Sequence, residues 1–277
     1  MAGSVSPSNA HAAMRDTPAR LAASIHSSIT SPANRWYKLK WRSQRLRSDN
    51  EAAAWLERAG DAAFDELQDS DFGVEIQASY QDLVGPGHAV VAQELVSEDA
   101  SEWRGFDFTA IPLREWFYEE DSRGGILRGY RLLYWSPGQI LERFGADCPK
   151  AIADKAKAGA DLTQRIELVF ALFRRPEAEK ELKARRRKNA ARLAARAKAK
   201  PNQAAVEAPE PLYPLAPHLR PVGAVYFLAD TGEPLGPETG YYEMPVSTSP
   251  WQKTTGSRWG HGPGIIALPT IKHLNAY

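Results

Sequence analysis

Three consecutive carboxylates, Glu119, Glu120 and Asp121, have the residue types that acid–base catalysis needs. A pair of such groups acts as a general acid and a general base when its surroundings separate the two pKa values. The run stands directly before Ser122-Arg123-Gly124-Gly125, which is a typical turn sequence. We therefore interpret these carboxylates as part of a solvated loop and not as a catalytic pair.

The residues that hold metals or act as nucleophiles lack the spacing that those roles require. None of the six histidines is four residues from another on a helix or adjacent to a cysteine. The single cysteine, Cys148, excludes an intrachain disulfide and a cysteine-built zinc site, and there is no Gly-x-Ser-x-Gly sequence. We predict no catalytic residue, no metal site and no cofactor, and keep a hydrolase with an unrecognised site only as a minor third hypothesis.

A glycine-rich stretch, Gly260-His261-Gly262-Pro263-Gly264, superficially resembles a loop that cradles phosphate. It lacks the Lys-Ser/Thr pair of a P-loop, and Pro263 removes an amide donor that such a cradle would use. We interpret it as a rigid turn between a strand and a helix.

The strongest charge signal is the segment 174–200, which has 12 Lys and Arg against three Glu, a net charge of +9. Cations at this density can neutralise phosphates, and no aromatic residue is interleaved for base stacking. A solvated charged helix that precedes a linker is an equal alternative. The candidate DNA-contacting residues are Lys183, Arg185, Arg186, Arg187, Lys188, Arg192 and Arg196.

The whole chain of 277 residues carries a formal charge of only +1, so the remainder must carry −8. The composition, 43% hydrophobic and 25% charged, is that of an ordinary globular protein. No apolar run approaches the roughly 20 residues that a membrane span needs, and the first 13 residues lack the apolar core of a secretory signal. These features predict a soluble protein made in a cytoplasm, with no membrane partner.

Periodicity and turn residues predict helices first and strands later. A helix is expected from Ala19 to Ser31, with Pro18 in its first turn, and a second begins with a Ser48–Glu51 capping box and ends near Ser70. The other expected helices cover 74–84, 137–144, 179–198 and part of 262–277. The expected strands cover 88–96, 106–111, 116–120, 126–135, 165–173, 223–228 and 240–246.

These elements predict an α+β protein: N-terminal helices, an antiparallel β-rich wing-like region, a basic helix with a Pro-rich linker, a β-hairpin and the start of a C-terminal helix. The basic helix has mainly alanine at its apolar positions, so we expect it to be solvated and only partly formed, and we expect no regular element in the linker 201–221. Four segments follow: a flexible N-terminus 1–18, a helical and β region 19–173, the basic helix and linker 174–221, and a hairpin with a helix entry 222–277.

The order of these segments resembles the portal, or head-to-tail connecting, protein of short-tailed bacteriophages. Any single piece is a weak match, but the collinear order is specific, above all in the stretches 240–245 and 259–275. The positions that carry the resemblance are Trp36, Leu39, Ser70, Phe72, Gly85, Gly87, Tyr242, Pro245, Trp251, Gly260, Gly262, Pro263, Leu268, Pro269, Leu274 and Asn275. The chain departs from the family pattern at His261, Thr270 and Pro250, where Arg, Asp and Arg are usual.

The resemblance implies a structural role in the virion, with assembly in the host cytoplasm. Portal subunits form a ring, usually of twelve copies, at one capsid vertex, and the ring is the conduit for packaging and ejection of double-stranded DNA. The implied partners are other copies of the chain, DNA, the terminase, and the capsid and tail adaptor proteins.

Family members are longer at both ends, so the resemblance also implies a truncated subunit, such as a fragment or prophage copy, and a basic insertion at 174–221. The alternative function is a nucleic-acid-binding accessory protein that acts through 174–200.

Overall fold

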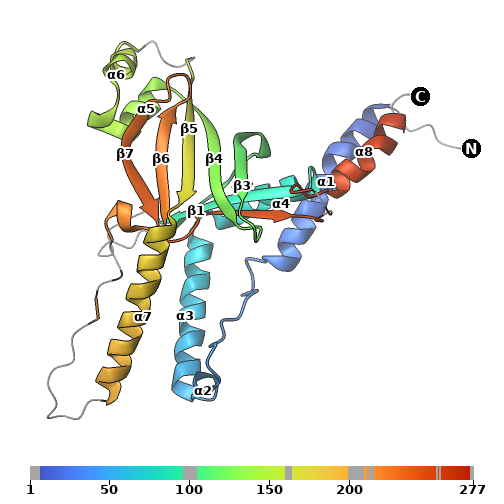
Figure 1. Cartoon of the computed structure of the whole chain (residues 1–277). Coiled ribbons are helices and arrows are strands. Elements are labelled where there is room, and N and C mark those ends of the chain that lie inside the picture. The colour runs from blue at the N-terminus through green and yellow to red at the C-terminus, as the bar shows by residue number, and fades with distance from the viewer. Residues whose placement is uncertain are drawn as a thin grey trace, which may run out of the picture. The chain divides into compact units, whose positions relative to one another are not determined.

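The computed structural model describes residues 7–95, 105–159, 164–198, 209–210, 212, 215–253, 255 and 257–274 (Figure 1). The chain divides into two compact units, which we describe separately. The first unit comprises Met1–Leu113 and Val246–Tyr277, and the second comprises Arg114–Pro245. Both mix helices with antiparallel strands, which confirms the predicted α+β class.

The first unit contains five α-helices among its described residues: α1 (Pro7–Ile29), α2 (Gln44–Arg47), α3 (Asn50–Asp69), α4 (Phe72–Val84) and α8 (Pro263–Leu274). Helix α1 packs on α4 through the buried residues Ala22, Tyr80 and Val84. The Thr30 and Tyr80 hydroxyls are 3.1 Å apart and satisfy each other at this interface.

Two predicted helix starts are wrong. Helix α1 runs through Pro18 instead of beginning there. Helix α3 is capped by Asp49, whose carboxylate accepts hydrogen bonds from the backbone amides of Glu51 and Ala52 at 2.9 and 3.1 Å. A carboxylate at the N-cap satisfies free amides and also suits the positive end of the helix dipole, so Asp49 takes the place assigned to Ser48.

A three-stranded antiparallel sheet completes the first unit, with strand order β2-β1-β8. Strand β1 (His88–Leu95) pairs with β2 (Phe106–Ala110) on one side and with β8 (Val246–Pro250) on the other. Helix α4 contacts both β1 and β2. The pairing of β1 with β8 joins residues more than 150 positions apart in the sequence.

The second unit is built on a five-stranded antiparallel sheet in the order β3-β4-β5-β6-β7. The strands are β3 (Trp116–Glu120), β4 (Ile126–Trp135), β5 (Ile166–Arg174), β6 (Val222–Leu228) and β7 (Pro234–Tyr241). Strand β5 lies at the centre, and Leu168 and Leu172 on it are fully buried. A central position explains why β5 reads as an almost continuous apolar run in the sequence.

Several helices accompany this sheet. The predicted helix after Ser136 begins with a complete capping box between Ser136 and Gln139, and this helix, α5 (Pro137–Phe144), contacts both β4 and the unpredicted helix α6 (Lys150–Lys157). Helix α7 (Pro176–Lys198) follows β5, and short 3-10 helices cover Leu113–Glu115, Gly145–Asp147 and Pro217–Leu219. The last of these, η3, lies inside the Pro-rich linker, so the expectation of no regular element there is wrong.

The predicted strand 240–246 is also wrong as a single element. Gly240 lies near the end of β7, whereas Val246 begins β8, which belongs to the sheet of the first unit. Pro245 lies between them and has no backbone N–H to donate to a strand ladder. A proline at this point ends one sheet before the chain enters the other.

Candidate functional site

Helix α7 carries the candidate DNA-contacting cations and has one buried face. Ala178, Leu182 and Asn189 are less than a tenth exposed, and the half-buried Arg185 and Arg192 fall on the same face at spacings of three and four. The helix contacts η3 of the returning chain. The expectation of a solvated, partly formed helix is therefore wrong, because residues of the Pro-rich linker cover one of its faces.

Asn189 fastens the linker to α7. Its Nδ2 donates to the backbone carbonyl of Glu210 at 2.7 Å, and its Oδ1 accepts from the Glu210 backbone amide at 2.9 Å. The two bonds satisfy the side-chain amide and the peptide groups of Glu210 together. A polar side chain in the middle of this helix therefore has a structural role.

Glu210 also binds two cations of α7. Its Oε1 lies 3.0 Å from Nζ of Lys188 and 3.2 Å from Nη1 of Arg192. The hydrogen bond and charge of Lys188 hold the pKa of the Glu210 carboxyl below its ordinary value. Lys188 and Arg192 are consequently engaged by the linker of their own chain.

Two further cations pair within the helix. Lys183 binds Glu179, whose carboxyl pKa it lowers, and Arg185 binds Glu181 at 2.9 Å. Both are glutamate-to-cation pairs at i,i+4, the favourable orientation on a helix. Such exposed pairs contribute only a few tenths of a kcal/mol each, so these cations can exchange partners.

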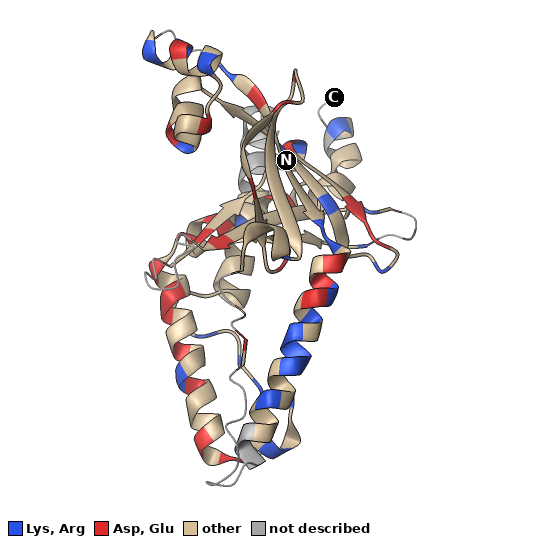
Figure 2. Ribbon diagram, turned by 60° about the vertical axis from the view of Figure 1, so that its left-hand side comes forward, with Lys and Arg blue, Asp and Glu red and all other residues tan. Residues whose placement is uncertain are grey.

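Among the described residues of α7, Lys180, Arg186 and Arg187 are exposed and have no ion-pair partner. The side chain of Arg196 lies outside the described residues. Figure 2 shows the resulting asymmetry along α7, with acidic residues in its first turns and basic residues beyond them. The structure thus separates the predicted cations into a set engaged with nearby glutamates and a smaller unpaired set.

The glycines of the family pattern come together in the first unit. A Cβ built on Gly87 would lie 1.9 Å from the backbone N of Gly262, and one built on Gly260 would lie 2.0 Å from the carbonyl O of Gly87. Gly87 also has a φ of +94°, and its carbonyl accepts a 2.9 Å hydrogen bond from the Trp251 amide. We call this contact of Gly85, Gly87, Gly260 and Gly262 the glycine junction.

Gly260 is held further by His88, whose Nδ1 accepts its backbone N–H at 3.3 Å while the imidazole packs edge-on against Trp259. Only residues without a side chain allow two backbones to approach this closely. The stretch that superficially resembles a phosphate loop is therefore a packing element that joins β1 to the entry of α8.

Other family-pattern residues also meet within the first unit. The rings of Trp36 and Phe72 stack with centroids 6.1 Å apart, and Phe72 contacts Phe108 edge-on at 5.2 Å. Ser70 accepts the Phe72 amide at 3.2 Å in the turn between α3 and α4. Leu39, Trp251 and Leu268 are about two-fifths exposed.

The remaining family-pattern positions are dispersed. Tyr242 accepts the Leu215 amide at its hydroxyl, with the Arg220 guanidinium 5.5 Å from its ring centroid, and Pro245 is buried. Pro263 begins α8 and Pro269 lies inside that helix. The side chain of Leu274 and all of Asn275 lie outside the described residues.

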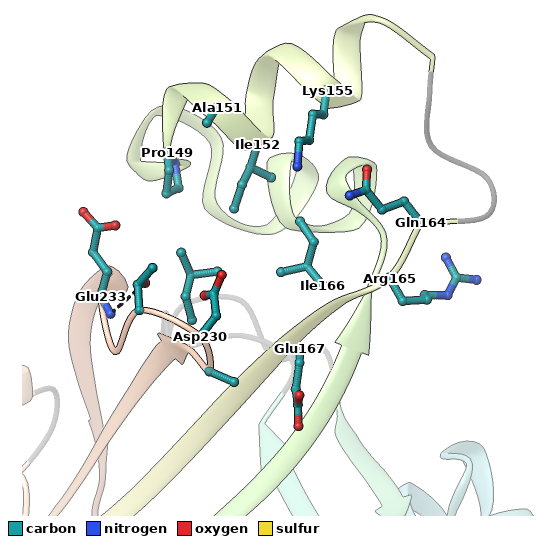
Figure 3. Close-up of a pocket in the computed structure, with 13 residues that line it drawn as sticks. Pro149, Ala151, Ile152, Lys155, Gln164, Arg165, Ile166, Glu167, Asp230 and Glu233 are labelled. Carbon is teal, nitrogen blue, oxygen red and sulfur yellow. Dashed lines mark hydrogen bonds between the residues drawn. The ribbon is translucent and has the colours of Figure 1, made fainter.

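A groove of about 520 Å³ lies between α6 and the adjoining ends of β5 and β6 in the second unit (Figure 3). Its charged residues are all exposed, and the bond drawn within it runs from the Glu233 amide to the Thr231 hydroxyl at 3.3 Å. None of the candidate residues named in the sequence analysis lines this groove. The exposed side chains that line it are Lys155, Arg165, Glu167, Asp230 and Glu233.

The carboxylates considered for acid–base chemistry lie at a hairpin. Asp121 accepts the amides of Arg123 and Gly125 at 2.8 and 2.9 Å, and these bonds lower its pKa. Glu119 pairs with Arg128 on the neighbouring strand at 3.5 Å. Burial raises the pKa of the Cys148 thiol, which disfavours the reactive thiolate.

Within the described part of the chain, no group of three or more His, Cys, Asp and Glu side chains is arranged to hold a metal ion. The helices described there include none with the length and apolar character to cross a membrane.

Comparison with protein families matches the bacteriophage head to tail connecting protein model to residues 9–206 and 219–277. The matched residues include α7 and both halves of the glycine junction, whereas the unmatched residues 207–218 lie in the Pro-rich linker. Comparison with curated proteins gives no match. Since the family model covers nearly the whole sequence, the chain belongs to the bacteriophage head-to-tail connecting protein family.

Proposed function

We propose that this chain is the subunit of a portal ring at a capsid vertex, through which double-stranded DNA is packaged and later ejected. The observation that carries the proposal is the family match over both compact units. The ring is a homo-oligomer, with twelve copies as the expected number, and it acts as a structural component of the virion without catalytic activity. Its other partners are the terminase, the capsid and the tail adaptor proteins.

A ring of identical subunits needs two different surfaces on each chain, because the contact repeats head to tail around an axis. A DNA conduit also has to let the duplex slide, which favours diffuse charge over base-specific contacts. The charge distribution of this chain, −8 outside the segment 174–200, agrees with a channel that does not hold DNA tightly.

Electron microscopy of the purified full chain tests this proposal. We expect closed rings with a central channel, at a protein concentration well above the threshold for assembly. A protein that stays monomeric at every accessible concentration would contradict the ring, whatever its affinity for DNA.

A second candidate function, nucleic-acid binding through the segment 174–200, is favoured by the exposed, unpaired cations Lys180, Arg186 and Arg187. If these three cations neutralise three phosphates, the logarithm of the binding constant should fall by about 3 for each tenfold increase in salt concentration. Arg186→Ala/Arg187→Ala would then reduce this slope by about 2. A duplex that binds the variant and the parent chain equally would rule this function out.

A further inference from the structure

Helix α3 carries a stripe of four carboxylates at i,i+4 spacing: Glu57, Asp61, Asp65 and Asp69. All four are exposed, and at 1.5 Å per residue they extend over about 18 Å of one helix face. Figure 2 shows that the charges of α3 are mainly acidic. We call these residues the acidic stripe.

Local cations neutralise only part of the acidic stripe. The Arg35 guanidinium binds both Glu57 and Asp61, the latter at 2.9 Å. Within the described residues, Asp65 and Asp69 have no cationic partner. Like charges at i,i+4 destabilise a helix, so an external cationic partner would relieve a repulsion that the isolated chain retains.

Helix α7 presents the complementary pattern on the face opposite its buried residues. Lys180, Lys183 and Arg187 are exposed there at spacings of three and four, and Arg186 flanks them. We call Lys180, Lys183 and Arg187 the basic stripe. Among the described residues Lys183 is held only by the exposed i,i+4 pair with Glu179, so it can turn to a better partner at little cost.

Each stripe is accompanied by one large exposed apolar side chain. Trp55 on α3 stacks on Trp41 but remains 54% exposed, and Leu193 on α7 is 55% exposed. Trp55 precedes the acidic stripe in its helix, whereas Leu193 follows the basic stripe in its own. At 3.6 residues per turn both side chains lie about 100–120° around their helices from the charged stripes, so they flank the stripes and the charges alone define the contact.

An antiparallel register opposes the charges of the two stripes. It places Asp61 opposite Arg187 and Asp65 opposite Lys183, and it brings Asp69 to Lys180.

We propose that the acidic stripe of α3 in one copy of this chain docks on the basic stripe of α7 in the next copy. This contact rests on the proposed ring and names two of its mating surfaces. A closed ring requires two different, complementary patches on one chain, and these helices supply them. The binding partner of the basic stripe is thus a second copy of the protein.

Double-stranded DNA is a poorer occupant of the same surface. The first turns of α7 carry Glu177, Glu179 and Glu181, so the net positive charge beside Lys180 is too small for a continuous phosphate backbone. Lys188 and Arg192 are engaged by Glu210, so the positive charge left for phosphate neutralisation is small. The few exposed cations of α7 match the few carboxylates of the acidic stripe in number and spacing. They do not match the continuous row of phosphates along a duplex.

Two charge-reversed full-length variants test the contact. Asp65→Lys/Asp69→Lys reverses the acidic stripe, and Lys180→Glu/Lys183→Glu reverses the opposed part of the basic stripe. Because opposed like charges repel, we expect each variant alone to need an at least about tenfold higher concentration to assemble. Sedimentation velocity measures that concentration, and circular dichroism verifies that each variant is folded.

Mixing provides the decisive measurement. In an alternating ring built from an equimolar mixture, half of the contacts pair a reversed acidic stripe with a reversed basic stripe, and the other half pair two unaltered stripes. Every contact then joins opposite charges, so we expect alternating rings to form as readily as the parent rings. The matched controls are Glu142→Lys/Asp154→Lys on α5 and α6, and Lys150→Glu/Lys157→Glu on α6. They change the net charge equally at exposed sites and should assemble like the parent chain.

The outcomes that contradict the contact can be told apart from those that contradict the ring. If both variants assemble like the parent chain, the proposed contact between α3 and α7 is wrong, but the proposed ring is unaffected. If mixing restores nothing but the four substitutions in one chain do, the stripes meet within a chain, which overturns a second copy as the occupant. Loss of duplex retention by the basic variant with normal assembly would assign the surface to DNA, and a monomeric parent chain would overturn both the ring and the contact.

Discussion

At the scale of single residues, the glycine junction is the most demanding feature of the first unit. Gly87 combines a positive φ with backbone atoms of Gly262 at the position that a Cβ would occupy. Any side chain there has to adopt a strained backbone and also displace the chain that leads into α8. Both halves of the junction belong to the matched family segments.

Replacing Gly87 with alanine is therefore expected to destabilise the protein by about 3 kcal/mol or more, combining left-handed strain with a steric overlap that cannot relax. Gly124 is the matched control, since its φ is +79° but nothing lies within 4 Å of the point where an alanine Cβ would stand. Gly124→Ala should cost only about 1 kcal/mol. Urea unfolding measures both, and equal losses would mean that the junction is not tightly packed.

The sequence indicates these glycines only in part. Their resemblance to family motifs singles out Gly85, Gly87, Gly260 and Gly262, and turn chemistry explains why glycine suits each segment. The contact between residues 87 and 262 is fixed by the pairing of β1 with β8, which no local pattern encodes. A backbone approach over this sequence distance depends on tertiary structure, so sequence reasoning predicts two separate turns.

At the scale of elements, α7 also combines a feature that its local sequence predicts with one that depends on tertiary structure. Its composition predicts a helix, and the structure has one over Pro176–Lys198. Its buried face was missed because the covering residues, Glu210 and η3, lie within the proline-rich stretch that was expected to have no regular structure. The buried positions are mainly small or polar, so no strong apolar stripe signals them.

Two leucines of α7 provide a test of this packing. Leu182 is 5% exposed and Leu193 is 55% exposed in the same helix. Leu182→Ala should cost about 2–4 kcal/mol because it empties a packed site, whereas Leu193→Ala should cost less than about 1 kcal/mol. The comparison uses the urea midpoint of dilute, unassembled protein, and a neutral Leu182→Ala would mean that the helix is solvated as its composition suggested.

Helix α6 and strand β8 show where local patterns were insufficient. Helix α6 has eight residues, and such short helices depend on packing, here of Ile152, more than on propensity. Strand β8 is short and polar, and its pairing with β1 defines it as a strand. Four strands of the five-stranded sheet, β3 to β6, were identified close to their observed bounds, whereas the fifth, β7, was not.

At the scale of the whole molecule, the near-zero net charge combines an acidic majority with one basic helix. Charge separated in this way allows identical copies to attract each other through different surfaces. Added salt should weaken such an assembly, since exposed charge pairs are screened within about 10 Å at 0.1 M ionic strength. We therefore expect the basic helix to act first as an assembly surface of a connector subunit.

The mass of the assembled particle, measured by native mass spectrometry of the purified full chain, tests the central claim most directly. A closed ring of twelve 30.6 kDa chains predicts one dominant species of about 370 kDa, which keeps its mass as the concentration rises. A 30.6 kDa monomer at every concentration, or a ladder of masses that grows without closing, would contradict the proposed ring.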